Sequence, residues 1–204
     1  DTLRDAHYAA AEGGPLMPEE THAVVAAKLK EIGPSVAVNL ELKVDSYFDV
    51  VRGLVDDFGA RNGLACVYIT SSVPASTLMG ALTALEVDTS SIYFVDCISH
   101  KLMGKIETAE HVVHLESPSM LENILLKVEY FSRLIPGKKL LVVIDSANSL
   151  ATNNDMKMLS EFLTILLNQL KMKEAYPVLL SLPDSLRPEA KEMLNLVCDY
   201  TLTV

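Results

Sequence analysis

The stretch KLLVVID, residues 139–145, decides the fold. Its apolar side chains stand on successive residues, which a strand tolerates only when both of its faces are covered. Short apolar runs recur from residue 64 onward with amphipathic helices between them, and strands that alternate with helices pair in parallel through right-handed crossovers. We therefore predict an α/β fold, a three-layer, doubly wound, mostly parallel sheet. Its predicted strands are 64–70, 91–96, 111–115, 139–145, 177–182 and 198–204.

Helix signals lie between these runs, at 76–87, 119–135 and 155–172. The second helix has a capping-box pattern, Ser119-x-x-Glu122, at its start. A further helix is predicted to start at Pro18 and to end at Gly33-Pro34.

The segment 36–42 alternates apolar and polar residues, which predicts an edge strand or an extended link. A helix capped by Asp45 or Ser46 then runs to Phe58. We accordingly divide the chain into an amino-terminal arm, helix and edge strand over 1–44 and the α/β domain over 45–204.

Composition excludes several classes of protein. Half of the 204 residues are hydrophobic, which excludes a disordered chain, and 17 basic against 27 acidic residues give a formal charge of -10. That charge repels phosphate backbones and anionic lipid, so we expect neither nucleic acid nor membrane as a partner. No apolar run approaches the roughly 20 residues of a membrane helix and no signal segment opens the chain, so we expect a cytoplasmic protein.

Polar side chains follow three of the predicted strands. The first strand runs into Ser71, Ser72, Ser76 and Thr77 before a helix, the second ends at Asp96, and the fourth ends at Asp145. The carboxyl ends of parallel strands are where a doubly wound sheet binds ligands. Serine and threonine at such a turn also serve as ordinary helix caps, and an aspartate at a strand end also accepts N–H bonds from the following loop. These residues are our candidate site, and both interpretations stay open.

The order of these phrases resembles the RecA/KaiC-like branch of the P-loop ATPases, in particular the archaeal KaiC-like proteins. The resemblance covers about residues 64–204, and it rests on five phrases. They are ITSSVPASTL for the phosphate loop, SIYFVDCIS for the second strand, VVHLESP for the third, VVIDSANSL for the acidic strand and the closing VCDYTLTV. It implies a RecA-type sheet and, in active members, ATP bound between subunits of an oligomer.

The decisive residues of that family do not carry over. A phosphate loop needs G-x-x-x-x-G-K-[ST]. Here Ser71 stands at the first glycine, Ser76 at the second, Thr77 at the lysine and Leu78 at the magnesium-binding hydroxyl. Asp145 matches the acidic position that orients magnesium-bound water in active members, and Asp96 lies where active relatives place a general base nearby.

The remaining reactive side chains predict no further chemistry. Cys66, Cys97 and Cys198 lack a CxxC pair and are expected to be reduced, mostly buried thiols. His111 and His114 fall on opposite faces of a strand, so no metal site is predicted.

Three hypotheses of function follow. The first is a non-catalytic RecA/KaiC-like domain that acts through protein-protein association, as a homo-oligomer or as a regulatory or signalling adaptor, and needs no cofactor. The two amino-terminal helices and the arm before Met17 are its candidate oligomer contacts. The second is a divergent ATP-binding protein or slow ATPase that uses the 71–77 loop, Asp96 and Asp145 with ATP and magnesium. The third, a DNA-repair accessory factor, is opposed by the charge of the chain.

Overall fold

The protein folds around one parallel sheet of seven strands. The computed structural model describes residues 18–204 except 105 and 107. Every strand pairs in parallel, in the order β4-β3-β2-β5-β6-β1-β7. The strands are β1 (Val38–Glu41), β2 (Ala65–Thr70), β3 (Ile92–Asp96), β4 (Val112–His114), β5 (Leu140–Asp145), β6 (Tyr176–Ser181) and β7 (Tyr200–Thr203).

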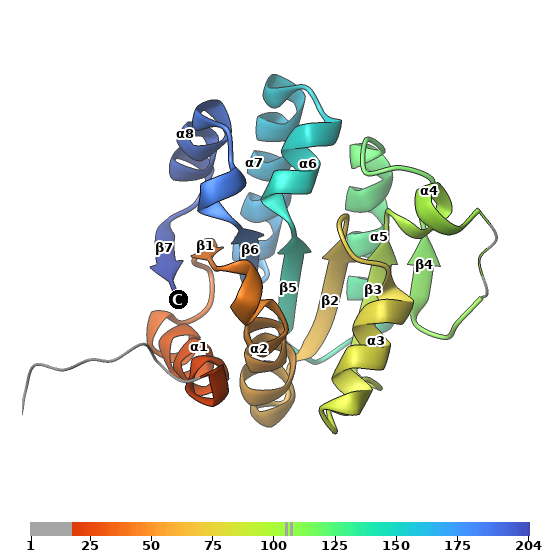
Figure 1. Ribbon diagram of the computed structural model, residues 1–204, viewed down its shortest axis with the longest axis vertical. Coiled ribbons are helices and arrows are strands. Elements are labelled where there is room, and N and C mark those ends of the chain that lie inside the picture. The colour runs from red at the N-terminus through yellow and green to blue at the C-terminus, as the bar shows by residue number, and fades with distance from the viewer. Residues whose placement is uncertain (1–17, 105, 107) are drawn as a thin grey trace, which may run out of the picture.

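Helices cover both faces of the sheet, so the predicted three-layer α/β class is confirmed (Figure 1). On one face lie α1 (Pro18–Ile32), α2 (Tyr47–Arg52) and α3 (Ala75–Ala84). On the other lie α5 (Leu121–Leu134), α6 (Ala147–Asn153), α7 (Met156–Met172) and α8 (Pro188–Val197), while the short α4 (Ser99–Met103) follows β3.

The central strands alternate between two apolar cores. Val67 and Ile69 of β2 face the core beneath α5–α8, whereas Cys66 and Tyr68 face the core beneath α1–α3. All six residues of β2 and all six of β5 are buried. Unbroken apolar runs are what such doubly covered strands require, and that pattern made these two strands predictable.

All the predicted strands are present, but two local predictions are wrong. The segment at 36–42 does not form an edge strand, because β1 lies between β6 and β7 and pairs with both. The capping box is also wrong, since α5 begins at Leu121 and the Ser119 hydroxyl bonds the Ser117 hydroxyl instead of the first turn of the helix. The arm before Met17 lies outside the described residues.

The amino-terminal helices pack against their own domain. Val25 and Leu29 of α1 are buried in the same core as Val50 and Leu54 of the α2 region. After Arg52 the helix widens into a π-helical stretch, Gly53–Gly59, which packs along α1. The apolar faces of α1 and α2, the candidate oligomer contacts, are therefore used within the domain. Among the described residues, no helix has the length and apolar character needed to cross a membrane.

We expect Gly53→Ala to destabilise the protein by about 1–3 kcal/mol, because the new methyl group would overpack the α1 contact. A Cβ at this position would lie 2.6 Å from the carbonyl oxygen of His22 and 2.8 Å from its Cα. Urea unfolding monitored by circular dichroism measures the change. Gly80→Ala in α3 is the matched control, because a Cβ there would meet no atom within 4 Å and alanine favours a helix. Equal stability of the two variants would contradict this account of the α1 contact.

Candidate functional site

The candidate site lies where the strand order reverses. From β2 the chain moves to β3 and β4 on one side, whereas from β5 it moves to β6 on the other. In open α/β sheets the crevice at the carboxyl ends of two such strands is the usual ligand site. β2 and β5 end at this edge, with Thr70 in register with Asp145.

Asp145 is buried at the end of β5, where hydroxyl groups surround its carboxylate. Oδ2 accepts hydrogen bonds from Tyr68 at 2.6 Å and from Tyr47, and Oδ1 accepts one from Ser72 at 3.0 Å. Burial raises the pKa of Asp145, although the three hydroxyl donors oppose the shift. Burial, together with the neighbouring Asp145, also raises the pKa values of Tyr47 and Tyr68, so both tyrosines remain hydrogen-bond donors. Three hydroxyl groups of the protein thus surround the Asp145 carboxylate.

Serine side chains bond the connections after β2 and β5 to each other. The Ser71 amide donates to the Asp145 carbonyl at 2.7 Å, and the Ser71 hydroxyl donates to the same carbonyl at 3.1 Å. Ser149, in α6, donates its hydroxyl to the Ser71 carbonyl at 2.5 Å. The backbone of the predicted phosphate loop is therefore bonded to the connection that follows β5.

The start of α3 does not have the form of a phosphate loop. Only Ser71–Pro74 separate β2 from α3, the segment has no glycine, and Pro74 has no amide hydrogen. Ser76 and Thr77 lie exposed in the first turn, and Leu78 is fully buried in the core beneath α3. A phosphate loop wraps glycine-rich backbone around its ligand, and this connection has neither the glycines nor the lysine of that pattern.

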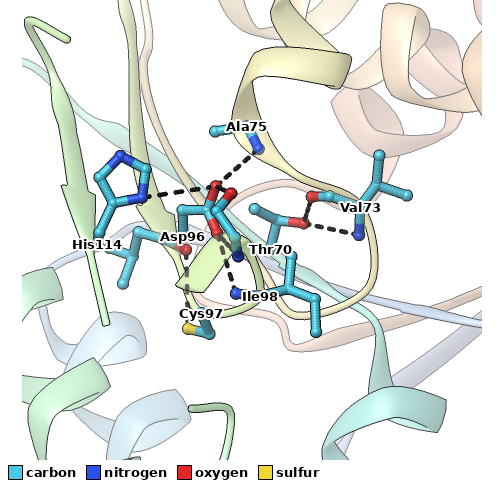
Figure 2. A network of polar contacts seen from close by, with 9 residues as sticks. Thr70, Val73, Ala75, Asp96, Cys97, Ile98 and His114 are labelled. Atoms are coloured by element: carbon cyan, nitrogen blue, oxygen red, sulfur yellow. Dashed lines mark hydrogen bonds and ion pairs between the residues drawn. The ribbon is translucent and has the colours of Figure 1, made fainter. Parts of the chain in front are cut away.

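The carboxylate of Asp96, the last residue of β3, lies at the amino terminus of α3 (Figure 2). Its carboxylate accepts the Ala75 amide at 2.8 Å, the Ser99 hydroxyl at 2.5 Å, and the amides of Ile98 and Ser99 at 3.0 and 2.9 Å. Burial opposes ionisation of this carboxyl, but the bonds from Ser99, Ala75 and Ile98 outweigh it and lower the pKa of Asp96. A carboxylate of the protein thus sits where the helix would hold an anion.

Asp96 and Asp145 share an edge of the sheet but bind different groups. Both are in register with Thr70, from the strands on either side of β2. Two strand spacings separate their Cα atoms by about 10 Å, and each carboxylate is held by its own set of donors. The described residues contain no group of three His, Cys, Asp or Glu side chains placed to hold a metal.

The structure explains the remaining reactive side chains. All three cysteines are free, and burial raises the pKa of Cys97 to about 12, which disfavours a nucleophile. His111 precedes β4 and stacks on Tyr93, whereas the Nδ1 atom of His114 lies 3.8 Å from Asp96.

Sequence reasoning missed Tyr47 and Tyr68. Tyr68 did carry a signal, because a tyrosine inside a doubly buried strand needs a partner for its hydroxyl group. Tyr47 follows β1 along the chain, and only the insertion of β1 between β6 and β7 brings it to Asp145.

We expect Asp145→Asn and Asp96→Asn to change stability with opposite pH dependence. Because the pKa of Asp145 is raised, the wild type loses stability as the pH rises above the ordinary aspartate range. The stability of Asp145→Asn relative to the wild type should therefore increase over the same pH range. The lowered pKa of Asp96 stabilises the wild type above that range, and this stabilisation is lost as the pH falls through the lowered value. Urea unfolding of the three proteins from about pH 3 to pH 8 measures both effects. The same pH trend in both variants would contradict the assignment.

Comparisons with known proteins connect this geometry to a fold. No protein-family model matches the chain, and no curated protein matches it. Solved structures do match. The KaiC-like protein PH0186 from Pyrococcus horikoshii OT3 superposes with a TM-score of 0.56 at 16% identity, over 83% of this chain and 71% of that one. The flagellar accessory protein FlaH from Methanocaldococcus jannaschii superposes with a TM-score of 0.56 at 10% identity, over 84% and 71%. The chain therefore has the RecA/KaiC-like α/β fold of these two structures.

Proposed function

We propose that this protein is a non-catalytic RecA/KaiC-like domain that acts by associating with protein, first of all with a second copy of itself. The observation that carries the proposal is the hydrogen bonding across the crevice between β2 and β5. Ser71 and Ser149 join the connections that follow the two strands, and the Asp145 carboxylate accepts hydrogen bonds from Tyr47, Tyr68 and Ser72. In a domain whose usual ligand position is used by the protein's own hydrogen bonds, the outer surface is the part that remains to bind a partner.

A surface suited to association lies over α5 and α7. Both helices expose large apolar side chains, and a shallow groove between them is lined by Leu125 and Phe162. Scattered apolar residues are normal on a protein surface, whereas neighbouring ones mark interaction sites. We call this the α5–α7 surface; its exposed apolar residues at the groove are Met158 and Ile165, and Met172 follows them on the same side of α7.

The pattern on α7 favours a second copy as the partner. Met158, Ile165 and Met172 lie seven residues apart, which places them on one side of the helix at every second turn. The order Met-Ile-Met reads the same from both ends. A two-fold axis would therefore set Ile165 against its own counterpart, and Met158 against Met172 of the other copy. Because each copy carries a formal charge of -10, we propose that apolar contact holds the pair and that added salt strengthens it.

We expect size-exclusion chromatography with light scattering to show a dimer that Ile165→Asp weakens by about tenfold or more, because the variant buries a carboxylate at the centre of the contact. Leu196→Asp is the matched control. Leu196 is 85% exposed, on α8 and outside the α5–α7 surface, so this variant should still dimerise. A wild-type protein that stays monomeric at high concentration would refute the self-association.

The alternative is a divergent ATP-binding protein or slow ATPase that uses the 71–77 loop, Asp96 and Asp145, and the fold neighbours keep it in consideration. We expect calorimetric titration of the wild-type chain with ATP and magnesium to show no binding up to millimolar nucleotide. Magnesium-dependent binding that Asp145→Ala weakens would favour the alternative instead. The third candidate, a DNA-repair accessory factor, predicts binding to single-stranded DNA at low salt, which the charge of the chain opposes.

A further inference from the structure

A cavity lies beside the first turn of α3. Its volume is about 280 Å³, and α3, α4, β4 and the connection before β4 contribute to its wall. An apolar cavity of about 150 Å³ already takes benzene, so this one has room for a substituted aromatic ring. The lining includes Ser76, Met79, Met103, Ala109, Val112 and His114.

Most of this lining is apolar, and the methionine side chains give it an adaptable shape. Met79 comes from α3 and Met103 from α4, while Val112 contributes from β4. Unbranched thioether chains adjust to ligands of irregular outline. Apolar walls with few polar groups are the usual composition of a small-molecule site.

Besides the hydroxyl groups of Ser76 and Ser99, the described wall has the polar imidazole of His114. Its Nδ1 atom is buried, has no hydrogen-bond partner, and lies 3.8 Å from Oδ2 of Asp96. A carboxylate on that side favours a proton on Nδ1. The other ring nitrogen, Nε2, points away from Asp96 (Figure 2). In the neutral imidazole with its proton on Nδ1, Nε2 is a hydrogen-bond acceptor.

The charge of Asp96 limits what the cavity can hold. Its carboxylate is fully buried beside Ala75 and Ser99, two of the lining residues, and it already takes the hydrogen bonds of both. The described lining residues include no lysine or arginine that would pair with an anion. An anionic ligand would meet the field of Asp96 in a largely apolar space, which disfavours it.

We propose that this cavity binds a small, uncharged, largely apolar molecule that carries one hydroxyl or N–H donor, and that His114 Nε2 accepts the hydrogen bond from that donor. The apolar body of the ligand packs between Met79, Met103 and Val112. This site is separate from the proposed dimer contact on α5 and α7, so either proposal can fail without the other.

The probe is 4-methylphenol, and toluene and 4-methylbenzoate are its comparison compounds. Toluene lacks the donor, and 4-methylbenzoate replaces it with a charge. Carbon-13 labelling of the methionine methyl groups in the full chain makes Met79 and Met103 reporters inside the cavity. Met172, 85% exposed on α7, is the reporter outside it. Met79→Leu and Met103→Leu assign the two signals.

We expect 4-methylphenol to shift the Met79 and Met103 signals and to leave Met172 in place. Toluene should bind about fivefold more weakly, the effect of one hydrogen bond, and 4-methylbenzoate more weakly still. His114→Phe should weaken 4-methylphenol to the level of toluene without changing the binding of toluene. His111→Phe, a matched change just before β4, should leave both affinities unchanged.

Three outcomes would overturn the proposal. The first is the absence of any shift at Met79 and Met103 up to the solubility limit of the phenol. The second is equal affinity for 4-methylphenol and toluene in the wild type, which would remove the hydrogen bond. The third is a preference for 4-methylbenzoate, which would reverse the argument from the charge of Asp96.

Discussion

The constraint behind this structure is the complete burial of its two central strands. All residues of β2 and β5 lie between two apolar cores, so neither strand offers a polar atom to solvent along its length. Most of the polar side chains stand at the carboxyl ends of the two strands, where Thr70, Ser71 and Asp145 are still buried. A buried polar group without a partner is costly, so the groups at this edge bind one another. The hydroxyl cluster around Asp145 and the amide cluster around Asp96 both result from that requirement.

The fold of this protein is similar to that of two proteins with which it shares little sequence. Structural similarity at 10–16% identity shows the architecture alone. Ligands of open α/β sheets bind where two strand connections part, and here the connections after β2 and β5 are bonded together. The hydroxyl groups of Ser71 and Ser149 make these bonds. Our proposals therefore place function on the outer helices and in the cavity beside α3.

The sequence predicted the fold well because an unbroken apolar run such as LLVVID indicates a strand with both faces covered, and β5 is such a strand. It predicted Asp96 and Asp145 at the ends of their strands, and their register with Thr70 agrees with a shared edge. Their partners were not predictable, since Tyr47 reaches Asp145 only through the position of β1 in the sheet. β1 itself was misplaced because alternation of apolar and polar residues is typical of an edge, whereas Asn39 is buried and its side-chain carbonyl accepts the Ser181 hydroxyl at 2.6 Å. The polar residue Asn39 was therefore interpreted as facing solvent, although its side chain is buried and hydrogen-bonded.

The insertion of β1 between β6 and β7 also bears on how the chain reaches its folded state. The Ala37 amide bonds the Asp199 carboxylate 162 residues away, and Val38 pairs with both Val178 and Tyr200. On the ribosome, β1 emerges long before either neighbour, so it cannot pair until nearly the whole domain has been synthesised. Until then both of its edges stay unpaired, a state that is slow to resolve and prone to aggregate. Completion of this sheet therefore waits for β6 and β7, which enclose a strand made more than 130 residues earlier in the chain.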